Sequence, residues 1–102
     1  MHPISDKAEV TIDFPDKLYM GSFGRDCSFD AHADADGMTI RLVRSSGERR
    51  EAEMHLHHFL FASILEELAR SLDAREPIDE VHREPLLAAA RKLAAALERR
   101  PG

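Results

Sequence analysis

Three histidines stand within four positions in the stretch EMHLHHFLF, residues 53–61. Alternate residues of an extended strand point to the same face, so Glu53, His55 and His57 would share one face of a strand. Imidazole and carboxylate groups at that spacing are typical ligands of zinc or nickel, and His58 is close enough in sequence to complete the set. These four residues define an alternative function, that of a divalent-metal-binding protein.

The surroundings of the cluster favour a structural role instead. The pattern of alternation places Arg41 on the neighbouring strand opposite Glu53, where a guanidinium repels a dication and offers the carboxylate a better partner. His57 and His58 fall where the pattern changes from extended to helical, in place of an ordinary capping residue. We therefore expect a strand-to-helix junction on the solvated face of a sheet and predict no cofactor.

Other motifs with chemical potential are weaker. Cys27 has no activating base or cation beside it in the expected strand and is predicted to be a small core residue. The stretch GSFG, residues 21–24, lacks the strand-turn-helix setting of a hydrolase nucleophile, and HADADG, residues 32–37, has His32 where a calcium loop begins with a carboxylate. The sequence does not indicate an enzyme.

Composition narrows the class of protein further. The chain has 102 residues, a formal net charge of −5 and 43% hydrophobic residues. Nucleic acid is not expected as a partner, because phosphate binding requires a basic surface. No stretch approaches the roughly 18 apolar residues of a membrane span, and the single cysteine cannot form an internal disulfide. We expect a cytoplasmic protein that does not contact membranes.

Hairpin signals dominate the middle of the chain. Asp36-Gly37 separates two alternating runs and predicts a two-residue turn, which would place Ala33 opposite Ile40. A three-residue loop at 46–48 then keeps the apolar residues of the next two strands on one face. This second register pairs Leu42 with Ala52, Ile40 with Met54, Arg41 with Glu53 and Thr39 with His55.

The remaining elements complete the expected fold. Residues 1–6 are expected to form a flexible tail, 8–14 a strand ended by Pro15, and 15–26 a loop. A helix from about residue 57 would bury one stripe, followed by a short helical turn at 78–83 and a second helix from about Pro85 to Arg99. The stripe of the first helix comprises Leu60, Phe61, Ile64, Leu65, Leu68 and Leu72.

The predicted architecture is a two-layer α+β domain spanning residues 7–100. It consists of an antiparallel four-stranded β-meander followed by two C-terminal α-helices packed on one face. The core of such a short chain is modest, which favours burial against another copy.

The helices also carry the expected contact surface. Phe59 lies away from the main stripe with Ala62 beside it, and small residues on the second helix let another helix approach closely. We therefore predict a non-enzymatic protein–protein interaction or oligomerisation module, acting as a homodimer or with a protein partner. The candidate interface residues are Phe59, Ala62, Ala89, Leu93 and Ala96.

A second alternative is a small-molecule-binding domain. Its pocket would lie between the sheet and the helices and would be lined by Tyr19, Phe23 and Arg25.

Overall fold

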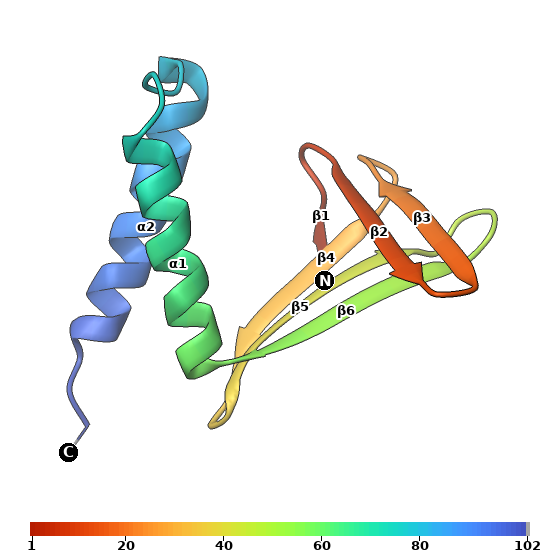
Figure 1. The fold of residues 1–102 in the computed structure, drawn as a ribbon, viewed down its shortest axis with the longest axis horizontal. Coiled ribbons are helices and arrows are strands. Elements are labelled where there is room, and N and C mark those ends of the chain that lie inside the picture. Colours follow the sequence, from red (N-terminus) through yellow and green to blue (C-terminus); the bar gives the residue numbers. More distant parts are fainter. Residues whose placement is uncertain (102) are drawn as a thin grey trace. The chain divides into compact units, whose positions relative to one another are not determined.

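Six strands are followed by two helices along the chain (Figure 1), as seen in a computed structural model that describes residues 1–101. The elements are β1 (His2–Pro3), β2 (Ala8–Phe14), β3 (Lys17–Phe23), β4 (Ser28–Ala33), β5 (Gly37–Arg44), β6 (Arg50–His57), α1 (His58–Asp73) and α2 (Glu80–Glu98).

The chain divides into two compact units. The first unit, Met1–Leu65, holds all six strands and the first half of α1. The second, which begins at Glu66, holds the rest of α1 and α2. Each unit is described by itself below.

The strands form two antiparallel sheets, which confirms the predicted α+β class. One sheet has the order β1-β4-β5-β6, in which the last three strands form a meander, and the other consists of β2 and β3. The four-stranded sheet is therefore present, but its fourth strand is β1 rather than residues 8–14. His2 and Pro3, in the segment expected to be a tail, pair with Phe29 and Ser28.

Residues 15–26 were wrongly predicted to be a loop. Strand β3 lies within them and pairs with β2 from Phe14–Lys17 at the turn to Ala8–Phe23 at the other end. Pro15 and Asp16 thus form a two-residue turn, where proline supplies a φ angle suited to the first central position. Pro15 ends β2 as expected, but it also starts a hairpin.

The β4–β5 hairpin has the predicted faces and a different register. Ala33 lies opposite Met38 rather than Ile40, so the pairing is shifted by two residues. The side chain of Asp34 accepts hydrogen bonds from the backbone N–H groups of Asp36 and Gly37, which centres the turn on Ala35 and Asp36. A shift of two residues leaves every side chain on its predicted face.

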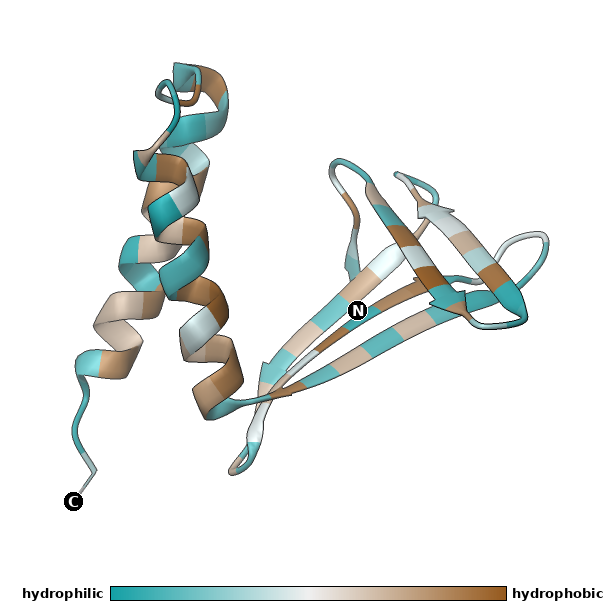
Figure 2. Cartoon of the chain, in the orientation of Figure 1, coloured by the Kyte–Doolittle hydropathy of each residue, from teal (hydrophilic) through white to brown (hydrophobic). Residues whose placement is uncertain are grey.

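The β5–β6 register is as predicted. Leu42 lies opposite Ala52, Ile40 opposite Met54, Arg41 opposite Glu53 and Thr39 opposite His55. Hydrophobic and hydrophilic residues alternate along these strands in Figure 2. The apolar residues thus share one face of the sheet, and the polar residues, including His55, share the other.

A small core lies at one end of the first unit. Ile4, Phe23 and Cys27 are buried there, as expected for Cys27, and half-buried residues of the sheet and of β2 pack against them. These neighbours are Val10, Phe29, Leu42 and Ala52. Farther along the same face Ile40 and Met54 are 40% and 56% exposed, so the core covers only part of the apolar face.

The helices differ from the expectation in burial and in one boundary. Neither α1 nor α2, both within the described part of the chain, has a buried residue, so the stripe predicted for α1 is not enclosed. Helix α2 runs without a break through Pro85, where a short turn and a new helix were predicted. It begins after Asp79, whose side chain accepts a hydrogen bond from the backbone N–H of His82 and caps the helix.

Candidate functional site

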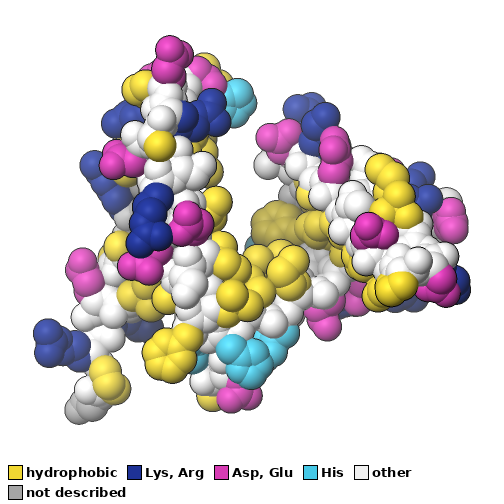
Figure 3. Space-filling model, viewed as in Figure 1, with side chains coloured by type: hydrophobic (Ala, Val, Ile, Leu, Met, Phe, Trp, Pro, Cys, Tyr) yellow, Lys and Arg dark blue, Asp and Glu magenta, His cyan; other side chains and the backbone are white. Residues whose placement is uncertain are grey.

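Strand β6 brings the chemistry-bearing residues of the first unit together. Glu51, Glu53, His55 and His57 alternate with Ala52, Met54 and Leu56, so the polar side chains share the face that also carries Thr39 and Arg41 of β5. Several histidine side chains lie next to one another on the surface of the molecule in Figure 3. The predicted clustering of the histidines on one face of the strand is thus present.

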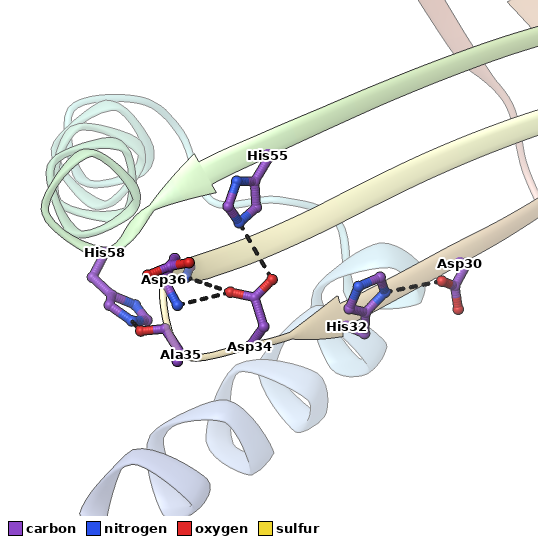
Figure 4. A network of polar contacts seen from close by, with 8 residues as sticks. Asp30, His32, Asp34, Ala35, Asp36, His55 and His58 are labelled. Carbon is purple, nitrogen blue, oxygen red and sulfur yellow. Dashed lines mark hydrogen bonds and ion pairs between the residues drawn. The ribbon is translucent and has the colours of Figure 1, made fainter.

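Two of the histidines contact the turn between β4 and β5 (Figure 4). The Nε2 atom of His55 lies 3.4 Å from Oδ2 of Asp34, and Nε2 of His58 lies 3.1 Å from the carbonyl oxygen of Ala35. The ring of His57 lies edge-on to that of His55, with ring centroids 4.9 Å apart. His57 is the last residue of β6 and His58 the first of α1, as expected for a strand-to-helix junction.

Asp34 is the residue that the sequence analysis missed. Its Oδ1 accepts the backbone N–H groups of Asp36 at 2.8 Å and Gly37 at 2.9 Å, while its other oxygen faces His55. The two backbone N–H groups, and to a lesser extent His55, hold the pKa of the Asp34 carboxyl below its ordinary value. The sequence Asp-x-Asp-Gly is itself a signal for such a turn, because aspartate side chains accept hydrogen bonds from the backbone two residues on.

Arg41 binds a different carboxylate from the one predicted. Its Nε donates to Oε1 of Glu51 at 2.6 Å, although Glu53 is the residue directly opposite in the ladder. The long guanidinium side chain reaches the diagonal neighbour, which lies within range of long side chains across an antiparallel pair. This hydrogen bond lowers the pKa of Glu51, and Arg49, whose Nη2 lies 3.7 Å from Glu51, adds to the effect.

The structure brings only some of the four predicted metal ligands together. Within the described residues, no three or more histidine, cysteine, aspartate or glutamate side chains are grouped so that they could hold a metal ion. Of the four predicted ligands, His55 and His57 are adjacent, whereas His58 is directed to the carbonyl oxygen of Ala35. The carboxylate beside the pair is Asp34 rather than Glu53.

The predicted interface residues all lie on the molecular surface. Phe59 is 92% exposed, and Leu93 is 36% exposed on α2. The three alanines, Ala62, Ala89 and Ala96, are exposed as well. Yellow side chains on the surface of the helices show this apolar exposure in Figure 3.

An open groove of about 820 Å³ occupies part of the first unit. Its walls are the β2–β3 hairpin and the apolar face of β5 and β6, and they include Tyr19 and Phe23 of the predicted small-molecule pocket. Arg25 is not among the lining residues, and the groove lies between hairpin and sheet rather than between sheet and helices.

Comparison of the chain with family models, with curated proteins and with solved structures gives no match. Neither helix in the described chain combines the length and the apolar character needed to cross a membrane.

Proposed function

We propose that this protein is a non-enzymatic interaction module that works as a homodimer, with α1 and α2 as the contact surface between copies. The observation that supports this most strongly is the lack of burial in both helices across the described chain. Large apolar side chains stand on their surfaces, among them Leu68 at 54% and Leu97 at 64% exposure. Exposed apolar surface of this extent is typical of an interaction site.

The spacing of these residues supports a helix–helix contact. Both helices repeat apolar residues at intervals of four, three and four, which is the pattern of a seam between packed helices. The α1 seam is Phe61, Leu65, Leu68 and Leu72, and the α2 seam is Leu86, Ala90, Leu93 and Leu97. A second helical pair supplies the partner seams of a four-helix bundle, and the alanines of α2 permit close approach.

The charges of the helices favour a second copy as the partner. Glu66, Glu67 and Asp73 stand against Arg70 on α1, a net charge of −2, since three acidic residues oppose one basic residue. On α2 three acidic and three basic residues cancel, namely Glu80, Glu84 and Glu98 against Arg83, Arg91 and Lys92. Helices with so little net charge can pack against copies of themselves without strong repulsion.

Sedimentation of the full chain over a range of concentrations tests the proposal. We expect a dimer in the wild type and a shift toward monomer for Leu93→Glu, with a Kd raised roughly 100-fold by charged groups in the apolar contact. Ala95→Glu is the matched control, because it makes the same change of charge on the opposite side of α2. A wild type that stays monomeric at high micromolar concentration, or two variants that behave alike, would contradict the proposal.

Metal binding is a second candidate, favoured by the adjacency of His55 and His57, which could supply two ligands, and by the carboxylate of Asp34, which lies 3.4 Å from His55. The described residues do not group a third ligand around this pair, so further ligands would come from solvent or from a rearranged side chain. Native-state ligands must stabilise the fold when the metal binds. For a metal site at His55 and His57, we expect zinc to raise the melting temperature of the wild type and of His32→Ala, but not that of His57→Ala. An unchanged melting temperature at every zinc concentration removes this candidate.

A further inference from the structure

Strand β6 forms one edge of the four-stranded sheet. Among the described strands it pairs with β5 alone, as the order β1-β4-β5-β6 requires. In Figure 1 the outer side of β6 faces no other strand of its sheet. An edge strand presents a row of backbone N–H and C=O groups that can pair with another strand.

Along this edge, glutamates and histidines lie at equal distances on opposite sides of Met54. Two glutamates, Glu51 and Glu53, precede it, and two histidines, His55 and His57, follow it at the same distances. The intervening residues Ala52, Met54 and Leu56 are apolar and lie on the other face. A strand of this kind is complementary to itself when it is reversed.

We propose that a second copy of this chain docks antiparallel along β6, with the two-fold axis at Met54. In this register Glu53 lies opposite the partner's His55, and Glu51 lies opposite the partner's His57. Directly across an antiparallel pair, an imidazole N–H can donate a hydrogen bond to the carboxylate that faces it, and on the other face Ala52 meets the partner's Leu56. The inference rests on the proposed self-association but uses a surface separate from the helices.

The charges select this register over its neighbours. A shift that centres the pair on Glu53 sets that carboxylate against its own copy, and a shift to His55 sets the two imidazoles against each other. A shift to any pairing centred between two residues places polar side chains opposite apolar ones and mixes the faces. Charged residues usually protect an edge strand from pairing with a copy of itself. In β6, one antiparallel alignment instead places each glutamate opposite a histidine of the partner.

The contacts of the exposed side chains are compatible with this pairing. Met54 is 56% exposed at the proposed axis, so a partner strand would cover apolar surface. Glu51 already accepts a hydrogen bond from Arg41, and His55 faces Asp34 and the ring of His57. Arg41 donates its hydrogen bond to Glu51 and interacts with Glu53 only through charge, so the contact between Glu53 and the partner's His55 is the most informative to test.

Disulfide trapping tests the position of the axis. In the full chain, Met54→Cys places two thiols opposite each other across the axis, so mild oxidation should link the copies. Ile40→Cys is the control, because Ile40 is similarly exposed at 40% but lies one strand inward, and native Cys27 is only 3% exposed. We expect a linked dimer for Met54→Cys alone. Failure to link, in a chain that still sediments as a dimer, overturns this inference and leaves the helical contact standing.

A charge exchange in the Met54→Cys background tests the pairing itself. His55→Glu sets glutamates against each other across the axis, and Glu53→Lys sets lysine against histidine. Each variant alone should form less linked dimer, whereas a mixture of the two restores opposite charges at both positions. We expect the mixture to link roughly tenfold more readily than either variant. A mixture no better than its components contradicts the charge matching, and equal linking of Ile40→Cys contradicts the register.

Discussion

At the scale of single residues, Asp34 organises the histidine-bearing end of the sheet. Its carboxylate accepts two backbone N–H groups of its own turn and faces His55 from the next strand. Sequence alone could place His55 and His57 on one face, but it could not show that the turn carboxylate lies beside them, because that depends on where the turn is centred.

The stability of the chain should depend on the ionisation of Asp34. Because the pKa of this carboxyl is lower in the folded chain than its ordinary value, ionisation stabilises the fold above the unfolded pKa of about 3.9. This contribution is lost as the pH falls through the lowered value. Urea unfolding at pH 7 should therefore show wild type to be more stable than Asp34→Asn, which keeps the turn acceptor but carries no charge.

At pH 3 the difference between wild type and Asp34→Asn should shrink, because this pH lies below the unfolded-state pKa of about 3.9, where the stabilisation from the lowered folded-state pKa is no longer fully present. His32→Ala serves as a control for loss of an exposed histidine contact, since His32 pairs with Asp30 and not with Asp34. A gap between wild type and Asp34→Asn that is the same at both pH values would show that the charge of Asp34 does not stabilise the turn.

At the scale of elements, the alternation of apolar and polar residues predicted the strand pairing better than the residues typical of turns did. The β5–β6 register could be predicted because, of a two-residue and a three-residue loop, only the three-residue loop kept Leu42, Ile40 and Met54 on a single face. The β4–β5 register could not, because Asp36-Gly37 and the actual turn at Ala35-Asp36 leave the same residues on each face. Strand β3 was missed because Gly21 and Gly24 indicated a bend where the first of them lies inside a strand.

Gly37 was singled out in the sequence as a turn residue, but in the structure it has a different role. The Asp-Gly pair predicted a two-residue turn centred on Asp36 and Gly37, yet in the described chain only Gly47 has a positive φ. Gly37 lies at the start of β5, and a Cβ built on it would be 2.1 Å from the backbone oxygen of Leu56. Glycine is required here because β6 approaches so closely.

Gly37→Ala should accordingly destabilise the first unit by about 1–3 kcal/mol, because the clash is with backbone that cannot move aside. Chemical denaturation gives this difference in the free energy of unfolding. Gly24→Ala is the control, since a Cβ at that position would meet only the Asp26 side chain at an ordinary 3.6 Å. Equal stability of the two variants would show that β5 and β6 leave room for a Cβ at Gly37.

At the scale of the whole molecule, burial is concentrated in a few residues. Ile4, Phe23 and Cys27 form the core cluster at one end of the first unit, while both helices of the described chain lack buried residues. The candidate interface residues remain predictions: Phe59 lies away from the α1 seam and Leu93 lies on the α2 seam, and both are exposed. The small extent of the core was less apparent, since alternation predicts which face is apolar but not how much of it is covered.

A homodimer makes the thermal stability of the chain depend on its concentration, because association stabilises the native state by mass action. For a dimer that unfolds to separate chains, a tenfold rise in concentration should raise the melting temperature by about 3 °C at this chain length. Calorimetry from low to high micromolar concentration measures the shift. Ala95→Glu should retain this dependence in full and Leu93→Glu should weaken it, because only Leu93 lies on the helical seam and neither change touches β6. A wild-type melting temperature that stays constant over the whole range would contradict self-association through either surface.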